Sequence, residues 1–178
     1  MPETPNPSPE KAPAPGIPPV DLGALLATFL GVLKGPAQFY TSIKEEKGFV
    51  KVLTFSIAMG AVYGVLRLIW WPLFGGSLGW GIRELIQSLI FGAVGPFVGG
   101  AIVWIICMFF GSKAPYEPSA RIAGYASAVL PVIGVCLFVK WIGWIAALVV
   151  FAYGVYIAVI GARTLNFEPP PPAATSTT

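Results

Sequence analysis

The stretch FGAVGPFVGGAIVWIICMFFG, residues 91–111, carries no charged side chain and is long enough to cross a bilayer as a helix. Its first half contains residues that weaken helices, namely Gly92, Gly95, Pro96, Gly99 and Gly100. Proline has no amide hydrogen, so Pro96 leaves the carbonyl of Gly92 without its helical partner and should kink the helix. Glycines let the backbones of membrane helices approach closely. We therefore expect a kinked spanning helix with a flat packing face.

The composition of the whole chain is that of a protein that crosses the membrane several times. Of its 178 residues, 56% are hydrophobic and 11% are charged, whereas soluble domains carry about 25% charged residues. The formal net charge of +3 is too small to indicate a nucleic-acid-binding surface. The chain has no histidine, and its two cysteines, Cys107 and Cys136, lie in apolar runs. We expect both thiols to act as small hydrophobic groups and expect no metal site and no cofactor.

The expected fold class is an all-α integral membrane helical bundle with four transmembrane helices. The four apolar stretches cover about residues 49–70, 85–110, 120–139 and 142–162. They form a transmembrane domain over residues 48–166, between a proline-rich tail at residues 1–20 and a second tail at residues 167–178. Both tails are poor in apolar residues that could form a core, so we expect them to be disordered.

Small residues four positions apart also occur in the first and third predicted spans. The first span contains Gly60 and Gly64. The third contains Ala120, Gly124 and Ala128, followed by Pro131, which should free the carbonyl of Ser127 and kink this helix. We expect these positions to be helix-packing surfaces, and a hinge or lined cavity at the prolines is the alternative.

Two short amphipathic helices are predicted in residues 21–47, ahead of the spans. The large apolar residues of the first recur at the spacing of one helix face, with Asp21 suited to its start and Lys34 to its end. Gly35 and Pro36 then interrupt the helix. Both segments are too short to cross the membrane. We expect them to lie at the interface, and a re-entrant insertion of residues 21–43 remains the alternative.

The distribution of basic residues predicts the orientation. If the N-terminus is cytoplasmic, the inner segments carry seven of them: Lys34, Lys44, Lys47, Lys51, Lys113, Arg121 and Arg163. The outer segments then carry three: Arg67, Arg83 and Lys140. We therefore expect both termini in the cytoplasm. Four of the inner lysines flank the short helices and should contact anionic lipid, namely Lys34, Lys44, Lys47 and Lys51.

Several short motifs occur in an order that resembles a known family. Pro36, Phe39 and Tyr40 form a P-x-x-F-[YF] motif before the first span, and the glycine-rich second span ends at Gly111. The next helix has Arg121, then Gly-Tyr-Ala at residues 124–126 with Tyr125 at its centre, then Pro131. Over about residues 36–166 the sequence resembles the bacterial branch of the Yip1 family of small polytopic membrane proteins.

The resemblance implies an integral membrane bundle with a cytoplasmic N-terminal region, and here a bacterial inner membrane. The eukaryotic members of the family are tied to vesicle traffic and to Rab-type GTPases. Their acidic D-L-Y-G-P motif is absent from this chain, and four predicted spans replace the five that are usual in the family. A Rab-linked role is therefore not carried over.

The sequence contains no pattern of a catalytic or nucleotide-binding site. Acid–base catalysis needs titratable groups that converge in a pocket, whereas Arg67, Arg83, Glu84 and Lys140 all map to the predicted outer interface. No serine occupies a G-x-S-x-G turn, and no glycine-rich loop follows a strand. We expect no enzyme activity, no nucleotide and no nucleic-acid partner.

Three functions remain from these observations. The preferred one is a structural or adaptor subunit that contacts the lipid bilayer and binds other membrane proteins or a second copy of itself. The alternative is a lipid-handling protein that remodels or scrambles the bilayer. The third is a small transporter or channel, which usually needs polar or ionised groups inside the membrane.

Overall fold

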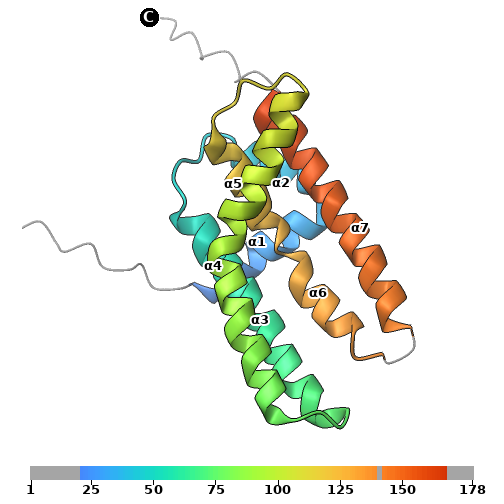
Figure 1. Cartoon of the computed structure of the whole chain (residues 1–178). Helices are drawn as coiled ribbons and strands as arrows, with labels where there is room; N and C mark the ends of the chain where they lie inside the picture. The colour runs from blue at the N-terminus through green and yellow to red at the C-terminus, as the bar shows by residue number, and fades with distance from the viewer. Residues whose placement is uncertain (1–20, 140–141, 168–178) are drawn as a thin grey trace, which may run out of the picture.

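The computed structural model describes residues 21–139 and 142–167, which form helices and no strand (Figure 1). The elements are α1 (Leu22–Lys34), α2 (Pro36–Ser42), α3 (Val50–Leu73), α4 (Leu78–Phe109), α5 (Tyr116–Ala126), α6 (Val129–Cys136), α7 (Gly143–Ala162) and the π-helix η1 (Arg163–Phe167). The all-helical fold class is confirmed. The predicted N-terminal tail, the C-terminal tail from residue 168 onward and the turn expected at residues 140–141 lie outside the described residues, whereas Phe167 is the last residue of η1.

Four stretches are long and apolar enough to cross a membrane, as the sequence predicts: Val50–Leu73, Leu78–Phe109, Tyr116–Cys136 and Gly143–Phe167. The second span differs most at its start, because α4 begins at Leu78 and not near residue 85. Gly81 permits this longer helix. A β-carbon at Gly81 would lie 3.0 Å from the Cα atom of Leu68, so the first turns of α4 already pack directly on α3.

The third span is two helices, α5 and α6, and not the single kinked helix expected over residues 120–139. At the junction, the amides of Ser127 and Ala128 donate to carbonyls three residues earlier, over 3.2 and 3.1 Å, which is the tighter 3₁₀ pattern. The interruption therefore precedes Pro131. The Ser127 carbonyl, which Pro131 should have left free, accepts the amide of Leu130 over 2.9 Å.

Glycines bring the backbones of α3 and α4 into contact. A β-carbon at Gly60 would lie 2.6 Å from the carbonyl oxygen of Ser88, and one at Gly92 would lie 2.9 Å from that of Ser56. Gly64, one turn further along α3, faces the side chain of Ser88. Each helix thus places a backbone carbonyl where a side chain of the other would have to go, so these three glycines cannot be enlarged without separating the helices.

The contact between α4 and α5 has the same character. A β-carbon at Gly100 would lie 2.8 Å from the backbone nitrogen of Ala120, and one at Gly99 would lie 3.1 Å from the β-carbon of Ala123. Ala120 is fully buried in this contact, and Ala128 is fully buried at the start of α6. Close approach of α4 therefore fixes the position of α5.

Two of the expected packing glycines have different surroundings. Gly124 lies between Val52 of α3 and Pro96 of α4, whose Cβ atom would be 3.4 Å from an added β-carbon. Gly95 has no atom within 4 Å of the place where a β-carbon would lie. Among the described residues, no neighbouring helix therefore approaches α4 closely at Gly95 itself. Pro96 is buried inside the continuous helix α4, and the kink expected there stays a prediction.

The main hydrophobic core includes the N-terminal helices. Its buried members come from six helices and are Val32, Tyr40, Val52, Phe55, Met59, Ile122, Tyr125, Ala128, Val129 and Ile157. The hydroxyl of Tyr153, midway along α7, also donates to the carbonyl of Leu33 in α1 over 2.5 Å. The helices α1 and α2 are therefore packed on the bundle. In Figure 1, α1 lies across the spanning helices and α2 lies between α5 and α7.

Replacing Gly92 by alanine should destabilise the bundle, whereas the same change at Gly95 should not. The added methyl group at Gly92 meets backbone atoms of α3 that cannot rotate away, so we expect a loss of about 2 kcal/mol. At Gly95 the methyl group enters open space, and the better helix propensity of alanine should leave stability unchanged or raised by up to about 1 kcal/mol. Unfolding of both variants by SDS in mixed micelles measures the difference, and equal losses would contradict the packing described.

Candidate functional site: the polar cluster around Arg121

The motif before the first span and the motif in the third span contact each other in the structure. Pro36 is the first residue of α2, where its fixed φ suits a helix start, and it places Phe39 and Tyr40 against α5. The ring of Phe39 contacts that of Tyr125 edge-on, with centroids 4.9 Å apart. Tyr40 is fully buried, and its hydroxyl is 3.5 Å from the carbonyl of Ile122, to which it donates. The motif residues therefore form one contact between α2 and α5.

Tyr40 depends on a glycine in the last span. A β-carbon at Gly161 of α7 would lie 2.8 Å from the Cζ atom of Tyr40, so only glycine leaves room for this ring. Burial raises the pKa of the Tyr40 phenol far above its ordinary value, and the neighbouring Tyr125 raises it further. Tyr40 is therefore a neutral donor across the physiological pH range, and its hydrogen bond does not depend on pH.

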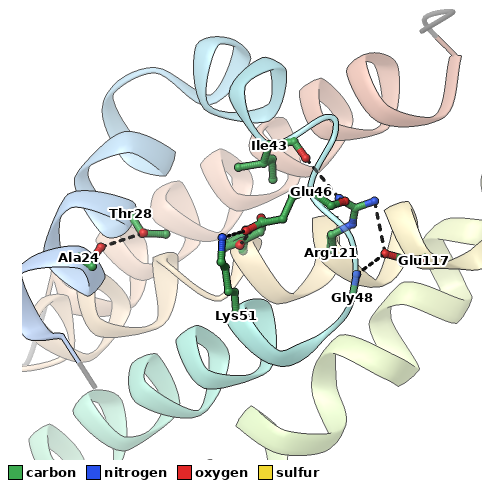
Figure 2. A network of polar contacts seen from close by, with 9 residues as sticks. Ala24, Thr28, Ile43, Glu46, Gly48, Lys51, Glu117 and Arg121 are labelled. Atoms are coloured by element: carbon green, nitrogen blue, oxygen red, sulfur yellow. Dashed lines mark hydrogen bonds and ion pairs between the residues drawn. The ribbon is translucent and has the colours of Figure 1, made fainter. Parts of the chain in front are cut away.

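Arg121 is the centre of the cluster. Its side chain is buried, with 5% of the residue exposed, although arginine rarely occupies such a site without partners. One terminal nitrogen donates to the carbonyls of Ile43, over 3.2 Å, and of Glu46. The other lies 3.7 Å from a carboxylate oxygen of Glu117, one turn earlier in α5 (Figure 2). Arg121 thus holds the backbone of the segment that connects α2 to α3.

Two carboxylates complete the attachment of this segment. Glu46 accepts a hydrogen bond from the Tyr125 hydroxyl over 3.1 Å and pairs with Lys51 over 2.6 Å. Glu117 accepts the amide of Gly48 over 2.7 Å, and Gly48 has the positive φ of 87° that favours glycine. We call residues 43–49 the connecting loop. It is fixed to α5 through its backbone and through one of its own side chains.

The cluster contains charged groups of both signs that contact one another. Two cations, Arg121 and Lys51, face two carboxylates, Glu46 and Glu117. Both carboxylates also accept hydrogen bonds, Glu46 from Tyr125 and Glu117 from the amide of Gly48. The Nε atom of Arg121 is the only buried side-chain nitrogen in the described ranges with no hydrogen-bond partner. No group of three or more residues in the described part of the chain has the types and positions to hold a metal ion.

The four lysines predicted to contact lipid are not equivalent. Lys51 is paired with Glu46, and Lys44 is half-buried at the turn after α2. Lys34, at the end of α1, and Lys47, in the connecting loop, have exposed side chains. Lys44 and Lys47 lie within the connecting loop, and Lys34 and Lys51 lie just before α2 and just after the loop. The four lysines therefore belong to one region of the molecule.

A second ion pair lies near the other end of α3. Arg67 makes two hydrogen bonds to Glu84 of α4, over 2.7 and 3.2 Å, and the Trp71 indole donates to the same carboxylate over 2.7 Å. The Arg67 guanidinium also stacks on the ring of Trp70, 4.5 Å from its centroid. The sequence predicts these charges at one interface, but the tryptophan contacts that enclose Arg67 could not be inferred from it.

Sequence reasoning missed a third polar cluster, around Asn166 of η1. The buried amide of Asn166 donates to Ser119 Oγ over 3.0 Å and to Cys107 Sγ over 3.2 Å. Its own backbone carbonyl accepts the hydroxyl of Ser112 over 3.0 Å. The sequence signal that could have indicated this cluster is an asparagine directly after an apolar span. The cluster ties the end of the last span to α4 and α5, so Cys107 is an acceptor as well as a small buried group.

The family model of the Yip1 domain matches residues 30–176, which is most of the chain and includes every residue of the Arg121 cluster. The chain belongs to the Yip1 family. Comparison with curated proteins gave no match, and comparison with solved structures gave none either. With its four apolar helices, this Yip1 protein is an integral membrane protein.

Replacing Arg121 by methionine should release the connecting loop of this Yip1 protein. Methionine keeps an unbranched apolar stem but leaves the carbonyls of Ile43 and Glu46 without their donor, and we expect a loss of about 3 kcal/mol. Trypsin should then cleave faster at Lys47, in the connecting loop. Arg163, which is exposed at the end of α7, provides the matched control, because Arg163→Met removes the same charge without touching the loop. Equal effects of the two changes would contradict the role given to Arg121.

Proposed function

We propose that this Yip1 protein is a non-enzymatic adaptor subunit of a membrane assembly, in a bacterial inner membrane and with both termini in the cytoplasm. The observation that carries the proposal is the use made of Arg121. Its two terminal nitrogens contact backbone carbonyls of the connecting loop and the carboxylate of Glu117, which supports a role for the buried charge in fixing a surface.

The fixed loop presents charged side chains outward. Glu45 and Lys47 are exposed, while Glu46 between them turns inward to Tyr125 and Lys51. A loop held in one conformation loses little freedom when a partner binds it, which is the general advantage of preorganised surfaces. This supports the connecting loop as the cytoplasmic contact of an adaptor.

Within the membrane, the surface of α4 at Gly95 is the proposed contact with a partner helix. Contacts between helices of this chain involve Gly60, Gly92 and Gly100, whereas Gly95 faces outward. Exposed apolar side chains surround it, including Val94 and Val98. A helix of another membrane protein can approach closely at a glycine, and van der Waals packing drives such association in lipid.

Affinity purification from the native host in nanodiscs, with mass spectrometry of the bound proteins, tests the adaptor function. We expect a stoichiometric membrane partner. It should be lost from the double variant Glu45→Lys, Lys47→Glu, which reverses the two outward charges of the connecting loop and leaves the net charge unchanged. Arg83→Glu, near the opposite end of the bundle, is the control and should retain the partner. Purification of the chain alone, or loss of the partner from the control as well, would contradict the proposal.

The proposed orientation has its own test, in a variant whose native thiols are removed by Cys107→Ala and Cys136→Ala. A single cysteine is introduced either at Lys47, in the connecting loop, or at Ser77, in the exposed turn between α3 and α4. A membrane-impermeant maleimide added to whole cells should label Ser77→Cys at once and Lys47→Cys only after permeabilisation. The reverse pattern would place the connecting loop outside.

A further inference from the structure

The helices α1 and α2 border a surface groove of about 490 Å³. One part of its wall is apolar, with Leu30 and Phe39, and the other is polar, with Lys34, Gln38 and Ser42. The groove therefore combines the two kinds of surface that an amphipathic ligand needs, within two adjoining helices.

Glycine at the base of the groove keeps it open. A β-carbon at Gly31 would lie 3.3 Å from the ring of Phe39, which is itself held against Tyr125. A larger residue at Gly31 would therefore fill the groove and press on the core. The shape of the groove follows from the same contacts that dock α2 on α5.

An apolar ridge leads away from the groove along α1. Leu22, Leu26, Leu30 and Lys34 follow one another at intervals of four residues, so they are neighbours on the helix surface. The exposed fractions of the leucines are 75%, 58% and 38%, falling toward the groove. The row from Leu22 to Lys34 is about 18 Å long. Three exposed leucines thus end at one exposed lysine.

The polar wall offers donors to an anion. Among the described residues, no carboxylate forms an ion pair with Lys34, and Gln38 is also exposed. The hydroxyl of Ser42 donates to the carbonyl of Phe39 over 2.7 Å, so it is already used. An ammonium and an amide, next to each other at the end of an apolar ridge, match the oxygens of a phosphodiester.

We infer that this groove binds one anionic phospholipid. Lys34 and Gln38 hold its phosphate, and one acyl chain lies along Leu30, Leu26 and Leu22. Charge complementarity selects an anionic lipid, and the ridge selects a lipid over a free phosphate. This site is independent of any protein partner and goes beyond the proposed adaptor function.

Native mass spectrometry of the full chain, released from a neutral detergent, measures this binding. The probes are phosphatidylglycerol and phosphatidylcholine with the same acyl chains. One phosphatidylglycerol molecule should stay bound per chain, in preference to phosphatidylcholine. Lys34→Gln should weaken its retention about fivefold, the effect of one basic residue at a membrane surface. Lys113→Gln removes the same charge from an exposed position in the loop between α4 and α5 and should leave retention unchanged.

A second variant tests the contact between the acyl chain and the leucine ridge of α1. Leu26→Ser alters the ridge away from Lys34 at an exposed position, so it should lower retention of phosphatidylglycerol without unfolding the chain, which circular dichroism can verify. Unchanged retention in this variant would overturn the acyl-chain contact. Equal losses in the Lys34 and Lys113 variants would reduce the effect to general attraction, and equal retention of the two lipids would overturn the site altogether. None of these outcomes bears on whether a protein partner is captured.

Discussion

A buried guanidinium imposes the main constraint on this structure. The positive charge of Arg121 is removed from water, and a charge in such a place is costly unless donors and acceptors surround it. The carbonyls of Ile43 and Glu46 and the carboxylate of Glu117 meet that need. The connecting loop must therefore lie on α5. Because α2 directly precedes this loop in the chain, α2 is also held against the bundle. The aromatic contacts of Phe39 and Tyr40 hold α2 against the same helix, α5.

The position of Arg121 depends in turn on glycine. Close contact between α3 and α4 at Gly60 and Gly92 aligns these two helices, and Gly100 then brings α5 onto α4 at Ala120. Ala120 and Arg121 are adjacent, so the closest contact of α5 with α4 lies next to the buried charge. Packing in the membrane and polar chemistry at the interface are thereby coupled, and a glycine in α4 can influence the connecting loop without touching it.

The sequence predicts those features that depend on local composition. Hydropathy finds the four spans, because each must match the same thickness of hydrocarbon, and the short motifs find Arg121 and Tyr125. Periodicity cannot tell which side of a helix meets its neighbour, so Gly92 and Gly95 look alike in sequence although only Gly92 contacts α3. The division of the third span before Pro131, the enclosure of Arg67 by tryptophan and the cluster at Asn166 also depend on partners far away in the chain. Such pairings are set by tertiary packing, which a single sequence does not record.

The hydrogen bond between Tyr153 and Leu33 joins residues 120 positions apart. Chains are synthesised and inserted from the N-terminus, so α1 and α2 are made long before the spans on which they rest. Tyr40 needs Ile122 and Gly161, and Leu33 needs Tyr153, which belong to the second half of the chain. The N-terminal helices can therefore complete their packing only after α7 has been inserted. These helices are thus made before the spans they pack on, yet reach their final position after them.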